Sequence, residues 1–120
     1  MTQATLLEIK LLQKARTVKL VFDTNEVFQL SCEYLRVFSP SAEVKGHAQT
    51  EGLLVTAKQM VNIIAIEPIG HYAVRFVFDD GHQTGLYSWD TLYTLARNYE
   101  INWQHYLERV EATGATDNFA

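Results

Sequence analysis

Large apolar and β-branched residues gather in three short stretches near the N-terminus, Leu6–Leu12, Val18–Phe22 and Val27–Leu30. Stretches of this length and composition favour β-strands. A short segment around Arg16 separates the first two, and the turn-forming cluster Asp23–Glu26 separates the second from the third. Because such short connections join antiparallel neighbours, the pattern predicts an antiparallel meander.

A short helix is expected next, because Ser31 can cap the N-terminus of a helix that runs through Phe38. Pro40 forces this helix to stop, since the residue before a proline avoids the helical conformation. The polar residues 39–50 are expected to form a loop. Residues 51–62 show no pattern that assigns them to an element.

The strongest strand signals of the chain are Ile63–Pro68 and Tyr72–Phe78, with a turn at Ile69–His71 between them. After Asp79–His82 the chain returns through Thr84–Tyr87, so this loop is expected to close a second hairpin. Alternation along the second strand predicts that four of its side chains share one face. These are Tyr72, Val74, Phe76 and Phe78.

Two helical patterns follow. Ser88 precedes the first, in which apolar residues from Trp89 to Tyr99 recur at helical spacing. The second pattern has apolar residues at i, i+3, i+4 and i+7, namely Trp103, Tyr106, Leu107 and Val110. Strands in two clusters, with most of the helices at the end, predict an α+β domain. We expect this domain to span residues 1–112 and a flexible, small and polar tail to span residues 113–120.

Composition and charge exclude several classes of function. The 120 residues carry ten Lys and Arg against 14 Asp and Glu, for a formal net charge of −4. Nucleic acids and anionic membranes need a clustered basic excess, and these ten are scattered. No apolar run is long enough to cross a bilayer, and no secretory signal opens the chain. We therefore expect a cytoplasmic protein that binds neither nucleic acid nor membrane.

The residues that could carry chemistry are few. His47, His71, His82 and His105 lie on different expected elements without metal-ligand spacing. His82 differs from the others because it follows Gly81 at a hairpin tip, where it either forms part of a turn or serves a metal or substrate. Cys32 either has a thiolate stabilised at a helix start or is a small buried residue.

No nucleophile elbow or phosphate-binding loop occurs in the sequence. Asp79 and Asp80 should point to opposite sides of an extended chain, so they cannot share a proton. The aromatic residues of the two helices are expected in the core, and enzymatic chemistry by this chain alone is not expected. These aromatic residues are Trp89, Tyr99, Trp103 and Tyr106.

Two stretches, "CEYLRVFSPSAEVKGH" (Cys32–His47) and "YAVRFVFDDGHQTGLYSWDTL" (Tyr72–Leu92), resemble one family. It is a small bacterial domain-of-unknown-function family related to the N-terminal domain of gamma-butyrobetaine hydroxylase. The likeness extends over roughly residues 5 to 110. In those hydroxylases the domain precedes a catalytic jelly roll that uses Fe(II) and 2-oxoglutarate. We expect no such domain in this chain, so the resemblance does not imply hydroxylation here.

The resemblance also implies a former zinc site of three cysteines and one histidine. The cysteine positions follow a segment matched here by residues 34–36, and they fall on Ser39, Ser41 and Val44, whereas the histidine falls on His82. Serine hydroxyls are poor zinc ligands and valine is none, so no metal cofactor is expected. His82 could instead form a hydrogen bond with Ser39 or Ser41 and so tie the hairpin tip to the loop.

Members of this family also resemble a module attached to Mrp-type ATPases that carry iron–sulfur clusters. The leading hypothesis is a non-catalytic binding or accessory module that engages a protein partner, in iron or iron–sulfur protein maturation. An exposed edge strand also allows a homo-oligomer. The predicted binding surface comprises Tyr34, Arg36, His47, Asp80, His82, Tyr87 and Trp89.

Two alternatives remain open at this point. In the first, the protein binds a single iron or zinc ion through His82 with Asp80, His47 or Cys32. In the second, it carries a small ligand.

Overall fold

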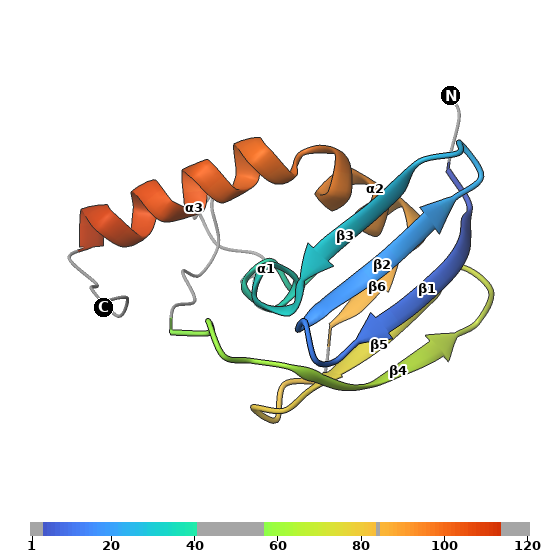
Figure 1. The fold of residues 1–120 in the computed structure, drawn as a ribbon, viewed down its shortest axis with the longest axis horizontal. Coiled ribbons are helices and arrows are strands. Elements are labelled where there is room, and N and C mark those ends of the chain that lie inside the picture. Colours follow the sequence, from blue (N-terminus) through green and yellow to red (C-terminus); the bar gives the residue numbers. More distant parts are fainter. Residues whose placement is uncertain (1–3, 41–56, 84, 114–120) are drawn as a thin grey trace.

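The computed structural model describes residues 4–40, 57–83 and 85–113. It contains two three-stranded antiparallel sheets, a short helix after the third strand and two C-terminal helices. Figure 1 shows the two sheets one behind the other, with the C-terminal helices along one side of them. The predicted α+β class and the order of its elements are confirmed.

The N-terminal sheet has the strand order β1 (Leu6–Leu12), β2 (Thr17–Phe22) and β3 (Val27–Ser31). The central strand β2 buries every second residue, as alternation requires when one face of a sheet covers the core. The meander is confirmed, with strand ends that differ from the prediction by one residue at most. Its buried side chains on β2 are Val18, Leu20 and Phe22.

The C-terminal sheet has the order β4 (Ile63–Ile69), β5 (Ala73–Phe78) and β6 (Leu86–Ser88). Val74, Phe76 and Phe78 are buried on one face of β5, as predicted. The prediction that Tyr72 shares this face is wrong. Tyr72 belongs to the turn before β5 and its side chain is 69% exposed, because alternation does not continue into a turn. The expected start of the returning strand, Thr84, lies outside the described residues.

The helices begin at capping serines. Ser31 Oγ accepts the backbone N–H of Tyr34 at the start of α1 (Cys32–Val37), and Ser88 Oγ accepts that of Thr91 at the start of α2 (Trp89–Arg97). Asn98 ends α2, so Tyr99 opens α3 (Tyr99–Thr113) rather than closing α2. Thr113, which was expected in the tail, is the last residue of α3, and residues 114–120 lie outside the described part of the chain.

The core lies between the two sheets and under the helices, and it draws buried residues from β2, β4, β5, α1 and α2. Tyr106 of α3 is 5% exposed, whereas Leu107, predicted on the same stripe, is 45% exposed. The three other aromatic residues that were predicted in the core are partly buried against it. They are Trp89, Tyr99 and Trp103. Across all described helices, none has the length and the hydropathy that a bilayer crossing requires.

Asn62, which immediately precedes β4, joins the two sheets. Its Nδ2 donates to the carbonyl of Gln13 at 3.0 Å, and Gln13 Nε2 donates to the carbonyl of Ile63 at 3.0 Å. Asn62 Oδ1 accepts the N–H of Ile63 and lies 3.7 Å from the thiol of Cys32. These two amide hydrogen bonds fix the end of the first hairpin against the start of the second sheet.

Candidate functional site

His82 lies at the tip of the loop between β5 and β6. Its carbonyl accepts the N–H of Phe78 at 2.9 Å, and its own N–H donates to Asp80 Oδ1 at 3.1 Å. Gly81 has φ +94°, a conformation that L side chains rarely adopt. The predicted turn, with Gly81 at positive φ and Asp80 capping a backbone N–H, is confirmed.

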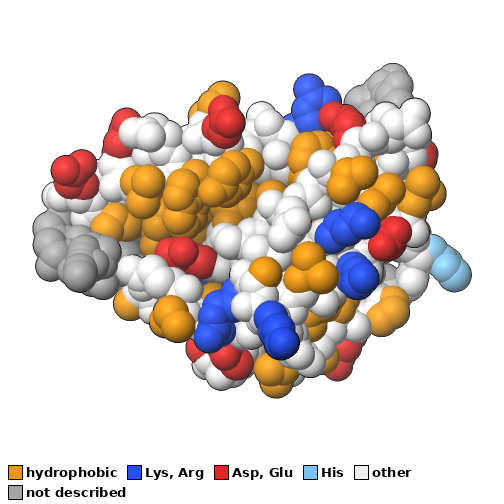
Figure 2. Space-filling model, in the orientation of Figure 1, with side chains coloured by type: hydrophobic (Ala, Val, Ile, Leu, Met, Phe, Trp, Pro, Cys, Tyr) orange, Lys and Arg blue, Asp and Glu red, His pale blue; other side chains and the backbone are white. Residues whose placement is uncertain are grey.

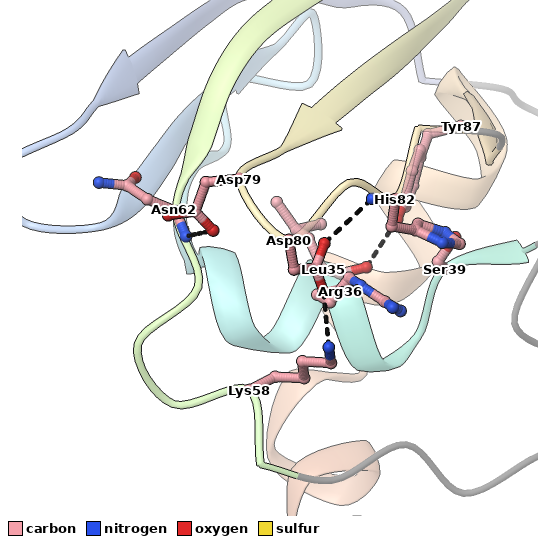
Figure 3. A network of polar contacts seen from close by, with 9 residues as sticks. All are labelled: Leu35, Arg36, Ser39, Lys58, Asn62, Asp79, Asp80, His82 and Tyr87. Carbon is pink, nitrogen blue, oxygen red and sulfur yellow. Dashed lines mark hydrogen bonds and ion pairs between the residues drawn. The ribbon is translucent and has the colours of Figure 1, made fainter.

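Ser39 meets the side chain of His82 from the end of α1. Its Oγ lies 2.9 Å from His82 Nε2, and the serine is fully buried. The predicted hydrogen bond between these two residues is therefore present, and it ties the hairpin tip to the segment after the helix (Figure 3). Ser41, Val44 and His47, the other predicted residues of this loop, lie outside the described residues.

Gly85 keeps the loop close to Ser39. A Cβ atom added to this buried glycine would overlap Ser39 Oγ and lie 3.4 Å from the ring of Pro40. Only a residue without a side chain lets the two segments approach so closely. Gly85 was not predicted as a site residue. The only feature of the sequence that could have indicated it is its position three residues after His82.

The environment of His82 keeps its imidazole neutral. Burial lowers the pKa of His82 below its ordinary value of 6.5, and the positive charge of Arg36 lowers it further. Asp80 acts in the opposite direction but does not compensate. The hydroxyl group of Ser39 carries no charge, so it offers no counter-ion that would favour protonation of the ring.

Asp80 receives two cations on the same oxygen. Arg36 Nε lies 2.9 Å and Lys58 Nζ 2.7 Å from Asp80 Oδ2. Burial opposes ionisation of this carboxyl group, but the hydrogen bonds from Lys58, the backbone of His82 and Arg36 outweigh it and lower the pKa of Asp80 to about 2. Lys58 was missed by the sequence analysis because residues 51–62 carry no pattern that could have indicated it.

Asp79 turns away from Asp80, as expected for neighbours on an extended chain. Its Oδ1 accepts the backbone N–H of Asn62 at 3.1 Å. Figure 3 shows the two carboxylates serving different partners. They are therefore not a catalytic pair, because a shared proton requires two carboxyl groups in contact.

Tyr34 and Tyr87, predicted on the binding surface, are core residues with no exposed area. Tyr34 Oη donates to the carbonyl of Leu95, and Tyr87 Oη donates to that of Leu35, each at 2.6 Å. Burial raises the pKa of Tyr34 to about 12 and also raises that of Tyr87. These hydroxyl groups satisfy carbonyls inside the fold, so this part of the prediction is wrong.

Trp89, also predicted on this surface, lies away from His82. It follows β6 and lines a groove with His71 and Tyr72, which precede β5, whereas His82 follows the far end of β5. One cluster therefore contains Arg36, Asp80 and His82 together with Ser39 and Lys58. Trp89 lies outside this cluster.

Cys32 is a buried thiol. Burial raises its pKa to about 11, so it stays protonated at neutral pH despite its place at the start of α1. Within residues 4–40, 57–83 and 85–113, no three His, Cys, Asp or Glu side chains are grouped to hold a metal ion. Two of the residues considered as metal ligands with His82 have other roles. Asp80 pairs with two cations, and Cys32 is buried in the core.

The two stacked meander sheets, the capped helices and this polar cluster define a small α+β domain. Residues 9–93 match the family model described as "Gamma-butyrobetaine hydroxylase-like, N-terminal". The chain belongs to this family, in agreement with the resemblance noted in its sequence. None of the curated proteins matches the chain.

Solved structures agree with this assignment. One solution NMR structure is 51% identical, with a TM-score of 0.82 over 97% of this chain and 89% of the other. A second is 36% identical, with a TM-score of 0.83 and coverage of 98% and 92%. A crystal structure from Acidithiobacillus ferrooxidans, described as a protein with unknown function of the DUF971 family, is 34% identical, with a TM-score of 0.64 and coverage of 77% and 92%.

Proposed function

We propose that this protein is a non-catalytic binding module that engages a protein partner. The observation that carries the proposal is that the polar groups of the His82 cluster bond to one another. Ser39 occupies His82 Nε2, and Asp80 holds Arg36 and Lys58. A general acid or base must instead be aimed at a substrate, with a pKa near the working pH. The family description, an N-terminal domain of a hydroxylase-like protein, supports an accessory role.

The partner binds to what we term the His82 face, formed by Arg36, Lys58, Asp80 and His82. The side chains of the first three are 12%, 24% and 21% exposed. Ion pairs held in place by a fold offer a partner a fixed charge pattern, which gives specificity and faster association. The resemblance to a module attached to Mrp-type ATPases favours a partner in iron or iron–sulfur protein maturation. Such a role places the protein in the cytoplasm.

A matched pair of variants tests the His82 face. His82→Ala and Ser39→Ala remove the same hydrogen bond, but only His82→Ala changes the surface, because Ser39 is fully buried. Protein captured from a lysate of the source organism should include a specific partner with wild type and with Ser39→Ala. Its recovery should fall about tenfold with His82→Ala, as for an interface residue worth about 1.4 kcal/mol.

Equal losses with both variants would show that the hydrogen bond acts through the fold and that His82 does not contact the partner. Circular dichroism of each variant separates loss of binding from loss of structure.

Elemental analysis tests the metal alternative. The protein is purified without chelator or affinity tag under anaerobic conditions, beside His82→Ala. Under the binding proposal, neither sample holds stoichiometric iron or zinc. Stoichiometric metal that disappears in His82→Ala would replace the proposal with a mononuclear metal site, because loss with one side chain identifies that side chain as a ligand.

A further inference from the structure

Two hollows lie toward the end of β5 that is opposite to His82. One hollow of about 370 Å³ lies between β1 and the C-terminal sheet, and includes Leu7, Ile66 and Pro68 in its wall. A second hollow of about 450 Å³ is lined by His71, Tyr72 and Asp90 among others. Trp89 lines both hollows, so they adjoin at this residue, and we call the two together the groove.

Two apolar side chains of this groove are unusually exposed. Leu7 is 65% exposed, because a bulge between Leu6 and Glu8 leaves it outside the register of β1 with β2. Tyr72 is 69% exposed, although its carbonyl is fixed by the backbone N–H of Trp89 at 3.0 Å. The backbone is therefore rigid at the aromatic end of the groove, while the side chain that it carries is open to a partner.

The charge of the groove has one sign. Glu8 and Asp90 are exposed carboxylates on its wall, and no Lys or Arg is among the described residues that line either hollow. A second copy of this acidic chain, with formal net charge −4, would bring like charges together there. A basic ligand would meet opposite charges.

The edges of the two sheets decide the shape of the ligand. β1 pairs with β2 on one side and is the edge of the described N-terminal sheet, so its other side can pair with an extended chain. β4, whose residues Ile66 and Pro68 also line the groove, is the less suitable edge for pairing, because Pro68 has no N–H to donate. An extended peptide can form backbone hydrogen bonds with the edge of β1, and its alternate side chains then point into the groove.

We propose that this groove binds an extended peptide with alternating apolar side chains and at least one Lys or Arg. The peptide lies along β1, with an apolar side chain between Leu7 and Trp89 and its basic residue near Glu8 or Asp90. Tyr72 contributes contact area as an exposed aromatic anchor. This site goes beyond the proposed function, since it lies at the other end of β5 from the His82 face.

Selection from a random heptapeptide display library tests the proposal. The selected consensus peptide is synthesised, and its affinity is measured by fluorescence polarisation. We expect basic peptides with alternating apolar residues, and an affinity about tenfold weaker for Tyr72→Ala, the loss of a contact worth about 1.4 kcal/mol. Leu107→Ala is the matched control, because Leu107 is an exposed apolar residue on α3, away from the groove.

Charge reversal gives a second pair of variants. Glu8→Lys should weaken binding of the basic peptide severalfold, and the loss should shrink at high salt because exposed charges are screened. Glu108→Lys, an exposed acid on α3, should leave binding unchanged.

Three outcomes would overturn the proposal. They are a library that yields no peptide dependent on Tyr72, a consensus rich in Asp and Glu, and a dimer in sedimentation experiments that Leu7→Ser dissociates. The last result would assign the groove to a second copy of the chain. Capture of the partner of the His82 face is measured separately and does not depend on any of them.

Discussion

The hydrogen bond between Ser39 and His82 joins two residues that are 43 positions apart in the sequence. The fold favours the neutral imidazole, because a protonated ring would be partly buried beside the positive charge of Arg36. The stability of the fold should therefore depend on pH through this residue.

Acidification should destabilise wild-type protein more than His82→Asn. The pKa of His82 lies below 6.5 in the folded state, so the unfolded state binds more protons as the pH falls through 6.5. The free energy of unfolding should then decrease until the pH passes below the folded-state pKa. Urea titrations at pH 7.5 and pH 5.5 measure this decrease for both proteins.

Asp80 does not obscure the comparison. Its pKa is lowered from 3.8 to about 2, so its contribution is lost as the pH falls from 3.8 to about 2, well below the two pH values compared. Equal decreases for wild type and His82→Asn would show that the imidazole is no less basic in the fold than in the unfolded chain.

At the residue scale, the turn at His82 and its hydrogen bond were predicted from the sequence. The neighbouring residues Gly85 and Lys58 were not. Gly81 and Asp80 are local signals of a turn, whereas Ser39 was reached through the family resemblance. Tyr34 and Tyr87 were placed on the surface wrongly. Each hydroxyl group bonds to a carbonyl more than 50 positions away, and no local pattern records such a partner.

Among the elements, α2 begins at a serine cap whose contribution to stability can be measured. Ser88 Oγ accepts the N–H of Thr91 at 3.1 Å and also lies 3.0 Å from the hydroxyl group of Thr91. Ser88→Ala should lower the free energy of unfolding by about 1 kcal/mol, because it leaves a helix N–H without its acceptor. Chemical denaturation of the purified variant measures the change.

Thr94→Ala is the control for this prediction. It removes a hydroxyl group from an exposed position inside the same helix, where alanine is the better helix former. Stability should be unchanged or slightly higher. If the two variants lost equal stability, the effect would belong to the helix surface and not to the cap.

Strands and helices were predicted well because their periodicities are local. Alternation located β2 and β5, and capping serines located the starts of α1 and α2. Some errors lie where an element ends, as at Tyr72. Others lie in segments that connect elements and have no periodic pattern of hydrophobic residues. Asn62 is of this second kind, since its importance comes from its bond to Gln13, in the turn that follows β1.

For the molecule as a whole, Cys32 reports on global unfolding. Its thiol is fully buried in a core that both sheets share, and its pKa is raised to about 11. A thiol reagent needs an exposed thiolate, so it should label the native protein at least about 10³-fold more slowly than the unfolded protein. Absorbance with a chromogenic disulfide reagent measures both rates.

Denaturant should accelerate the labelling in parallel with loss of circular dichroism. Rapid labelling with the full native spectrum would instead indicate that the end of the first hairpin opens locally, away from Asn62.

The junction at Asn62 also has a consequence for how the chain folds. Within the described sheets every strand pairs with its neighbour in the sequence, so all the ladders are local and can form on the microsecond timescale of hairpins. The long-range step is the docking of one meander on the other, and in that step Asn62 donates to the carbonyl of Gln13 and Gln13 to that of Ile63. The two halves of the chain would then assemble early, and their association would set the folding rate.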